Sequence, residues 1–275
     1  MCRGSAHRPH SCLPCTEMRA ISVDVASRTC LSWAMTSSDG FSPTTYGESF
    51  ADVYDHWYPD ISDTAATVEF VNDMGPSQNV LEMGVGTGRL ATPLQRVGHD
   101  VVGIDASLSM LHRATGRMVA AHMSQVPLRG GTFDTVLIAT NTLFNLATES
   151  EQLACFAEAR RVLRLGGRLV VEAFVPPEPD PQRDQLVTTR SIDVNRVVLV
   201  ATIRNEEDQT ITGQHIEITE SGTRLRPWRI RFATTDQLDT MAAAHGFRLG
   251  DRHGDWDHSP FTSTSARHVS VWVAV

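Results

Sequence analysis

The stretch Val80-Leu81-Glu82-Met83-Gly84-Val85-Gly86-Thr87-Gly88 decides the fold, because it joins an apolar run and an acidic residue to three alternating glycines. This pattern predicts a buried parallel strand, a tight turn and then a helix over Leu90 to Val97. Glycines in such a turn adopt positive φ and let a ligand approach the bare backbone. The spacing is G-x-G-x-G, whereas a dinucleotide-binding turn has G-x-G-x-x-G, so the last glycine comes one residue early.

A second buried strand, Val101 to Asp105, is predicted downstream and also ends in an acidic residue. Asp105 follows the glycine turn at the distance of about twenty residues that is typical of the ribose-binding carboxylate in a βαβ nucleotide site. A carboxylate there accepts both ribose hydroxyls in charge-assisted hydrogen bonds. Ser107 is the expected N-cap of the helix that follows.

Together, the two segments resemble motifs I and II of the class I S-adenosylmethionine-dependent methyltransferases. Phe133-Asp134-Thr135-Val136 is similar to the FD-x-V fourth strand of that family, and Leu163-Arg164-Leu165-Gly166-Gly167 is similar to its L-x-P-G-G turn, with leucine in the place of proline. The resemblance covers roughly Tyr46 to Phe174. Within that family, the order and spacing of the motifs look most like those of the sugar-amine N-methyltransferases of antibiotic biosynthesis, although this second resemblance is looser.

The resemblance implies S-adenosylmethionine as the cofactor. The segment from Tyr46 to Tyr58 resembles the family's Y…F-A-x-x-Y-D lid, although its aromatic spacing over Phe50 to Trp57 also fits a packed amphipathic helix. His122 stands where the family usually has an aspartate that contacts the adenine amine. A neutral imidazole accepts from that amine, and the alternative is a residue without a ligand at the end of a third strand, Val119 to Met123. The implied cofactor-binding residues are Tyr46, Tyr54, Glu82, Met83, Gly84, Gly86, Gly88, Asp105, Ala106, Met110, His122, Met123 and Thr140.

Residues of the acceptor site are expected at the carboxyl ends of the later strands. Glu172, which ends the predicted fifth strand, is the acidic group best placed to act as a base or to hold an amine, and the alternative is a structural carboxylate. Asn145 occupies the position of a candidate histidine base in the sugar-amine enzymes, and an asparagine cannot act as a base. Arg229 and Arg231 share one face of a predicted strand, where they are either solvated or bind an anionic group. The expected substrate contacts are Tyr58, Asn141, Phe144, Phe174, Arg229 and Arg231.

The overall pattern predicts an α/β fold, a Rossmann-like, doubly wound methyltransferase sheet with five parallel strands and a reversed final hairpin. The final strand, His268 to Val275, alternates in polarity and is expected at an edge. Runs rich in β-branched residues over 194–203, 210–219 and 224–232 predict an antiparallel β meander, inserted at about 185–232 over the substrate pocket. Residues 42–275 form the predicted methyltransferase domain.

Charge and cysteine content limit the class of protein. The 275 residues carry a net charge of −8, which disfavours a nucleic-acid-binding surface. No apolar run approaches the ~18 residues that span a membrane. The five cysteines, and the lack of a secretory apolar segment, predict a cytoplasmic protein without a disulfide framework.

The first residues, 1–41, show no helical or strand periodicity and are expected to form a disordered extension. Their histidines and cysteines have spacings that would suit a zinc site. Because the sequence predicts no helix or strand around them, we expect no metal. A native start at Met35 is left open. The possible zinc ligands are His7, His10, Cys12 and Cys15.

These observations predict transfer of a methyl group from S-adenosylmethionine to N or O of a small metabolite. Two alternatives stay open, a methyltransferase acting on RNA or protein and a non-catalytic module that binds S-adenosylmethionine or a nucleoside. The expected partner is a small-molecule methyl acceptor, without membrane or nucleic acid, and a homodimer is left open.

Overall fold

The computed structural model describes residues 40–59, 63–180 and 182–275. The predictions made for the first 39 residues, which include the zinc spacing and the start at Met35, lie outside the described residues. None of the described helices is both long and apolar enough to cross a membrane.

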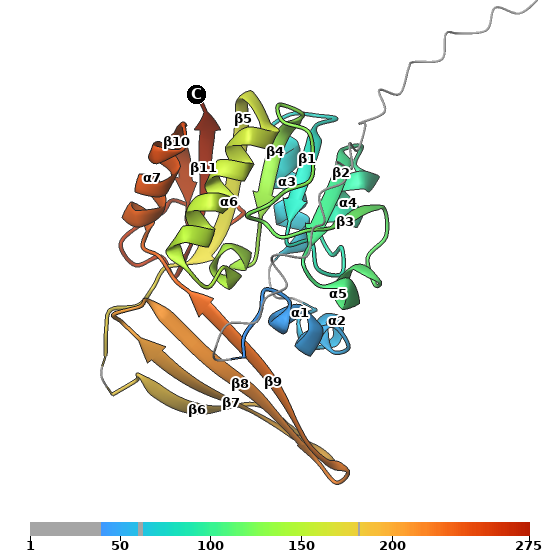
Figure 1. The fold of residues 1–275 in the computed structure, drawn as a ribbon, viewed down its shortest axis with the longest axis vertical. Coiled ribbons are helices and arrows are strands. Elements are labelled where there is room, and N and C mark those ends of the chain that lie inside the picture. The colour runs from blue at the N-terminus through green and yellow to red at the C-terminus, as the bar shows by residue number, and fades with distance from the viewer. Residues whose placement is uncertain (1–39, 60–62, 181) are drawn as a thin grey trace, which may run out of the picture.

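A seven-stranded sheet forms the centre of the larger part of the molecule (Figure 1). Its strand order is β10-β11-β5-β4-β1-β2-β3. The first five strands pair in parallel, while β11 runs antiparallel to both β5 and β10. The predicted doubly wound sheet with a reversed final hairpin is therefore confirmed. Its strands are β1 (Asn79–Met83), β2 (Asp100–Asp105), β3 (Arg117–Ala120), β4 (Phe133–Ile138), β5 (Leu163–Phe174), β10 (Phe247–His253) and β11 (Arg267–Ala274).

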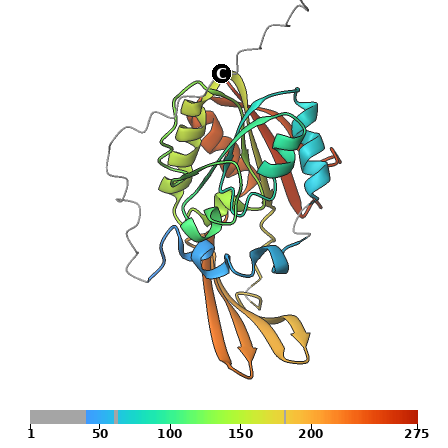
Figure 2. The ribbon, with the colours of Figure 1, turned by 90° about the vertical axis from the view of Figure 1, so that its right-hand side faces the viewer.

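Helices cover both faces of this sheet, as the near-continuous apolar strands require. Figure 2 shows α6, in yellow-green, and α3, in cyan, on opposite sides of the sheet. The predicted cap at Ser107 is present, because its side chain accepts from Met110 N–H. Asp63 caps the helix before β1 in the same way, since its side chain accepts from Ala66 N–H. The helices are α3 (Thr64–Asp73), α4 (Ala91–Arg96), α5 (Leu108–Leu111), the 3₁₀ helix η2 (Thr142–Asn145), α6 (Glu149–Val162) and α7 (Thr235–Ala244).

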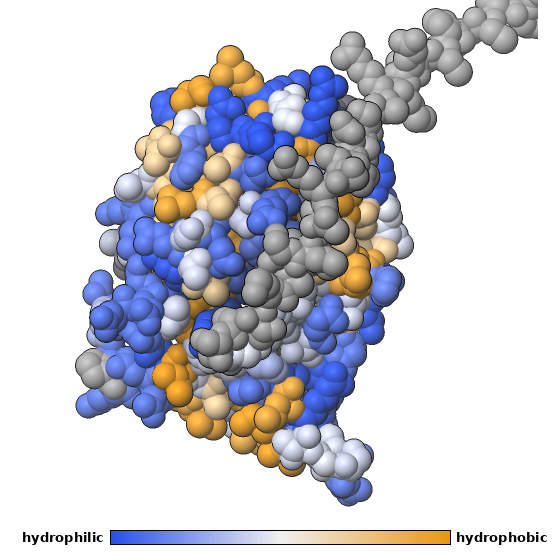
Figure 3. All heavy atoms as spheres, viewed as in Figure 1, coloured by the Kyte–Doolittle hydropathy of each residue, from blue (hydrophilic) through white to orange (hydrophobic). Residues whose placement is uncertain are grey.

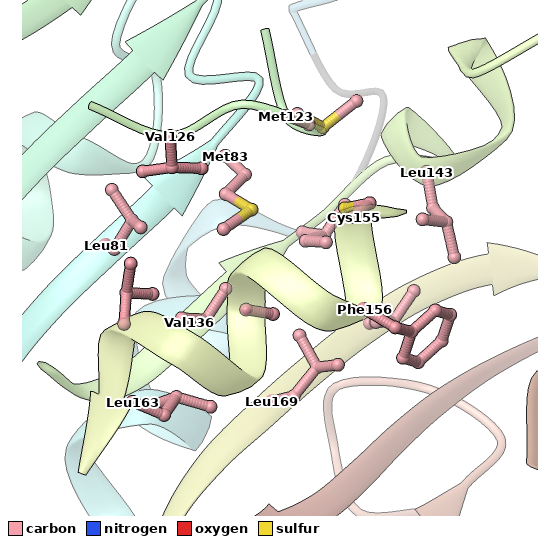
Figure 4. Close-up of a cluster of buried hydrophobic side chains, with 14 of the residues drawn as sticks. Leu81, Met83, Met123, Val126, Val136, Leu143, Cys155, Phe156, Leu163 and Leu169 are labelled. Carbon is pink, nitrogen blue, oxygen red and sulfur yellow. The ribbon is translucent and has the colours of Figure 1, made fainter. Parts of the chain in front are cut away.

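The largest apolar cluster lies between the sheet and α6 (Figure 4). Leu81, Val136 and Leu169 come from β1, β4 and β5, and Phe156 of α6 packs over them. Met83 belongs to the same cluster and is fully buried. The strand that leads into the glycine turn is thus anchored in the core, which fixes the position of the turn.

A second, four-stranded antiparallel sheet projects from the main body (Figure 1). Its strands are β6 (Gln185–Asp193), β7 (Arg196–Asn205), β8 (Thr210–Thr219) and β9 (Gly222–Arg231), paired in sequence order. The inserted meander is confirmed, but β6 precedes the three predicted runs. Every residue of β6 is exposed, so the strand has no alternation between a buried and an exposed face. Hydrophobic residues gather at this end of the surface (Figure 3).

Two strands differ from the predictions. The strand β11 is not an edge strand, because it lies between β5 and β10. The third strand ends at Ala120, where its partner β2 also ends at Asp105, so His122 and Met123 lie in the loop beyond it.

The expected helix over the aromatic segment is interrupted. It forms α1 (Thr45–Phe50) and α2 (Tyr54–Trp57), separated by a turn at Ala51 to Val53. The break lets Phe50 and Trp57 face each other edge to face with ring centroids 6.2 Å apart. Both short helices lie between the main sheet and the inserted sheet (Figure 1).

Candidate active site

A cavity opens at the carboxyl ends of β1 and β2. Ligands of open α/β sheets bind at this edge. Residues from six separate segments meet there, from α1 and α2 to the segment after β4. The lining consists of Pro43, Tyr46, Gly47, Tyr54, Gly84, Gly86, Asp105, Ala106, Met110, Ala121, His122, Met123, Thr142, Asn145 and Leu146.

The glycine turn forms one wall of the cavity. Gly84 and Gly86 have φ of 75° and 56°, which side chains rarely permit. A Cβ at Gly84 would overlap Cγ2 of Thr142, so only glycine lets the segment after β4 pack against the turn. At Gly86 the space is open, and the bare backbone faces the cavity.

Asp105 joins this turn to the end of β2. Its Oδ2 accepts from Gly86 N–H at 2.9 Å, and Oδ1 accepts from Ser107 N–H at 2.8 Å. Burial raises the pKa of Asp105, and the two backbone N–H groups partly oppose that shift. Each carboxylate oxygen accepts more than one hydrogen bond, so Asp105 has the capacity to bind hydroxyl groups as well.

Glu82 lies behind the turn, outside the cavity lining. Its side chain is buried, and Oε2 has no hydrogen-bond partner among the described residues. Burial raises the pKa of Glu82 to about 8, and the nearby Arg89 acts against this shift. A buried carboxyl oxygen without a partner fits a site for a cationic ligand, which makes the predicted cofactor compatible with this wall.

Tyrosines from α1 and α2 form the opposite wall. The rings of Tyr46 and Tyr54 line the cavity at a centroid distance of 6.5 Å. Burial raises the pKa of Tyr54 to about 12 and raises the pKa of Tyr46 well above its usual value, so both hydroxyls keep their protons. Tyr58 lies behind them and stacks with Arg190 of β6, whose guanidinium is 4.4 Å from the ring centroid.

His122 lines the cavity with its ring orientation set by Ser124. The Ser124 backbone N–H, which can only donate, is 3.4 Å from Nδ1, and the Ser124 hydroxyl is 2.6 Å from the same nitrogen. We therefore assign the acceptor role to Nδ1 and the ring proton to Nε2. Burial lowers the pKa of His122 and favours the neutral ring. The acceptor nitrogen that was expected to meet the adenine amine is thus engaged by Ser124.

The two residues predicted for catalysis are placed differently. Asn145 lines the cavity, whereas Glu172 does not. Burial raises the pKa of Glu172, and its Oε2 accepts from Thr140 N–H at 2.8 Å. Its Oε1 is 3.6 Å from Nη1 of Arg267. Both carboxylate oxygens of Glu172 therefore have neighbours within the protein.

The remaining predicted cofactor residues surround the cavity without lining it. Met83 belongs to the core cluster, and a Cβ at Gly88 would lie 3.3 Å from the Cβ of Ala114. Thr140 accepts a hydrogen bond from Arg89 through its hydroxyl at 3.0 Å. These residues support the walls of the cavity.

The residues predicted to contact the substrate do not converge on this cavity. Phe144 is fully buried and packs edge to face on Phe174 at 5.1 Å, while the Asn141 side chain accepts from Phe174 N–H. Arg229 and Arg231 line a different hollow, between the inserted sheet and the start of α6. Neither arginine lines the cavity that contains the predicted cofactor residues.

The two arginines also have partners within the protein. Arg231 is buried and donates to Gln152 Oε1 at 2.7 Å. It also forms an ion pair with Glu149 at 3.3 Å. Arg229 donates to the Thr212 hydroxyl at 3.0 Å, and its guanidinium is 4.4 Å from the ring centroid of Phe41.

Five lining residues were not predicted from the sequence. Gly47 could have been predicted, since it lies beside Tyr46 in the segment that resembles the family's lid. A Cβ at Gly47 would overlap Ser107, so this glycine lets α1 approach α5 closely. Tertiary packing alone brings the others to the cavity. They are Pro43, Ala121, Thr142 and Leu146.

Comparisons with known proteins all find methyltransferases. A family model described as "Methyltransferase domain" matches residues 81–171. The solved structure of the CcbJ methyltransferase from Streptomyces caelestis is similar at a TM-score of 0.79 and 33% identity, over 86% of this chain and 100% of that chain. The cypemycin N-terminal methyltransferase of a Streptomyces species is 25% identical over 83% of this chain and 97% of that enzyme.

A third relative matches over a shorter region. The demethylmenaquinone methyltransferase of Renibacterium salmoninarum is 35% identical over 39% of this chain. That alignment spans 46% of the relative, less than half its length.

Proposed function

Because the chain belongs to the class I S-adenosylmethionine-dependent methyltransferases, we propose that it transfers the cofactor's methyl group to an amine nitrogen of a small molecule. The observation that carries the choice of nitrogen is the chemistry of the cavity lining. Its ionisable side chains are those of Tyr46, Tyr54, Asp105 and His122. Each of them has a role in the described structure other than that of a general base.

None of these four groups is poised as a base. Both tyrosines keep their protons because burial raises their pKa values. The Asp105 carboxylate accepts from two backbone N–H groups, and the acceptor nitrogen of His122 is engaged by Ser124. A hydroxyl acceptor needs a base, whereas a neutral amine brings its own lone pair. An amine acceptor therefore fits this lining better than a hydroxyl.

The chain's residues would bind, orient and exclude water. The cofactor, when bound, supplies a methyl group on a sulfonium that is already activated for displacement. Asp105 would accept hydrogen bonds from the ribose hydroxyls, and the backbone at Gly84 and Gly86 would lie against the cofactor. Tyr46 and Tyr54 would exclude water and donate hydrogen bonds from the opposite wall. The catalytic contribution would be alignment of the acceptor nitrogen with the methyl group.

The names of the relatives are compatible with this proposal. The cypemycin enzyme, whose length this chain nearly spans, is named for methylation at an N-terminus. The demethylmenaquinone enzymes are named for a small-molecule substrate. The choice of nitrogen is therefore supported by the cypemycin enzyme and by the cavity lining, and not by the demethylmenaquinone enzymes.

The test is a turnover assay with a panel of acceptors. The protein is incubated with S-adenosylmethionine and either small amines, the matching alcohols and phenols, a short peptide or an RNA, and methylated products are identified by mass spectrometry. We expect N-methylated products from small amines only. Methylation of oxygen alone, or of RNA alone, would contradict the proposal. Binding of the cofactor without turnover on any member of the panel would favour a non-catalytic module.

A further inference from the structure

We propose that Glu172 is a positioning residue, whose carboxylate holds the turn at Thr140 and Asn141 and so sets the cavity wall that contains Thr142 and Asn145. This inference rests on the proposed function, because the wall belongs to the cavity assigned to the cofactor. In this inference Glu172 does not act as a base, and it affects the cavity through the backbone of the turn that it holds.

The turn after β4 has an unusual conformation. Thr140 and Asn141 have φ of 56° and 61°, so two successive residues with side chains occupy the left-handed region. A β-branched residue such as Thr140 rarely adopts this conformation, because its side chain crowds the backbone there. The surrounding structure must therefore hold the turn in place.

The end of β5 supplies the interactions that hold it. The Glu172 carboxylate accepts from Thr140 N–H at 2.8 Å, and the Glu172 backbone carbonyl accepts from Asn141 N–H at 3.1 Å. The Asn141 side chain in turn accepts from Phe174 N–H at 2.6 Å. Since β4 and β5 are neighbours in parallel register, the turn and the carboxylate meet at one edge of the sheet.

The turn determines where the next segment runs. Directly after it, Thr142 begins η2 and packs against Gly84 of the glycine turn. Asn145 and Leu146 then line the cavity. A change at Thr140 would therefore be transmitted to the wall within a few residues, and the glycine turn would lose its packing partner.

The position of Glu172 also argues against direct chemistry. The side chain is 6% exposed, and Glu172 does not line the cavity. One carboxylate oxygen faces the Thr140 backbone and the other lies near Arg267. The two roles make different demands on residue 172, because a base must lose and gain a proton whereas a positioning residue needs only an acceptor oxygen.

A rescue experiment tests the positioning role. We expect Glu172→Ala to weaken binding of S-adenosylhomocysteine by about tenfold, because the Thr140 N–H loses a charged acceptor. Adding Thr140→Gly should restore affinity to within about threefold of Thr140→Gly alone, since glycine adopts positive φ without cost. The matched control is Thr140→Ala, which removes the same hydroxyl but keeps the strain, and it should give no rescue. Dissociation constants from calorimetry are the measurement.

A second variant separates the two roles. Glu172→Gln keeps an acceptor oxygen, so it should retain affinity for S-adenosylhomocysteine and leave the acidic limb of the kcat profile against pH unchanged. If Glu172→Gln and Glu172→Ala lose turnover equally while affinity stays at the wild-type level, Glu172 is a base and this inference is wrong. Failure of Thr140→Gly to rescue would also overturn it, and wild-type protein that does not bind S-adenosylhomocysteine would overturn the proposed function together with it.

Discussion

Asp105 is the single residue on which cofactor binding should depend most. Its carboxylate is proposed to accept two ribose hydroxyls, and it also accepts from Gly86 N–H and Ser107 N–H. Charge-assisted hydrogen bonds contribute roughly 1.5–3 kcal/mol each, so Asp105→Ala should weaken binding of S-adenosylhomocysteine about a hundredfold or more. Calorimetry measures this change directly.

The matched control is another carboxylate of the same sheet that lies outside the cavity. Asp134 accepts from Asn79 N–H at 2.8 Å at the beginning of β4. Asp134→Ala should lower the melting temperature and leave cofactor affinity at the wild-type level. Equal affinities for Asp105→Ala and wild type, with both proteins folded, would show that Asp105 has only a structural role.

Glu82 should make the stability of the cofactor-free protein depend on pH. Its pKa is raised from 4.5 to about 8 by burial. Between these values the folded protein keeps the proton and the unfolded chain does not, so unfolding releases a proton and stability falls as pH rises. Glu82→Gln removes this contribution. Melting temperatures from pH 5 to 8 should therefore fall more steeply for wild type than for Glu82→Gln, and parallel curves would contradict the assignment.

The contact between α1 and the inserted sheet is the element-scale feature that closes the cavity. Arg226 of β9 is 1% exposed in its side chain and donates to Asp52 Oδ1 at 2.6 Å and to Ser49 O at 2.5 Å. It also pairs with Glu217 of β8 at 3.0 Å. Because α1 and α2 carry Tyr46 and Tyr54, this guanidinium fixes a cavity wall from the outside.

Arg226→Ala should consequently disturb both stability and cofactor binding. Breaking a fully buried pair costs about 3–5 kcal/mol, and the partial exposure of Asp52 should reduce that to about 2–3 kcal/mol. Arg224 is a close control, because it pairs with the same Asp52 but is 56% exposed, and exposed pairs contribute about 0–1 kcal/mol. Urea denaturation and S-adenosylhomocysteine titration of both variants provide the test. A larger loss in Arg224→Ala would refute this account of the contact.

Elements with a clear local sequence pattern were the ones that could be predicted from the sequence. The strand before the glycine turn, the Ser107 cap of α5 and the five parallel strands with a reversed final hairpin follow patterns that the structure confirms. The interior position of β11 could not be predicted, because His268 and Ser270 alternate with valines and imitate an exposed face. In the structure both polar side chains are buried and lie 2.9 Å apart, Nδ1 to Oγ.

The same distinction applies to the cavity. Gly84, Gly86 and Asp105 belong to compact motifs at the ends of β1 and β2, and the parallel pairing of these two neighbouring strands brings them together. Thr142 reaches the glycine turn only because Thr140 and Asn141 before it are left-handed. No local sequence pattern predicts that backbone conformation. Arg229 lies on β9, and it lines the hollow between the inserted sheet and the start of α6 instead of the cavity.

At the scale of the whole molecule, the proposed chemistry predicts how activity depends on pH. No cavity-lining side chain in the described structure is poised as a base, so the acceptor amine must lose its own proton before transfer. The rate at low acceptor concentration should rise with pH through the pKa of the free amine. A series of amine acceptors with different pKa values should shift the midpoint accordingly, and a midpoint that stays constant across the series would instead identify a base on the protein.

The central claim is that the cavity at the ends of β1 and β2 binds S-adenosylmethionine. Glycine spacing, the buried Glu82 and the placement of Asp105 all belong to this claim. Isothermal titration calorimetry of the full chain with S-adenosylhomocysteine and, separately, with NAD is the most direct measurement. The account predicts saturable binding of S-adenosylhomocysteine at one site per chain and no binding of NAD. Tight binding of NAD with none of S-adenosylhomocysteine would contradict it.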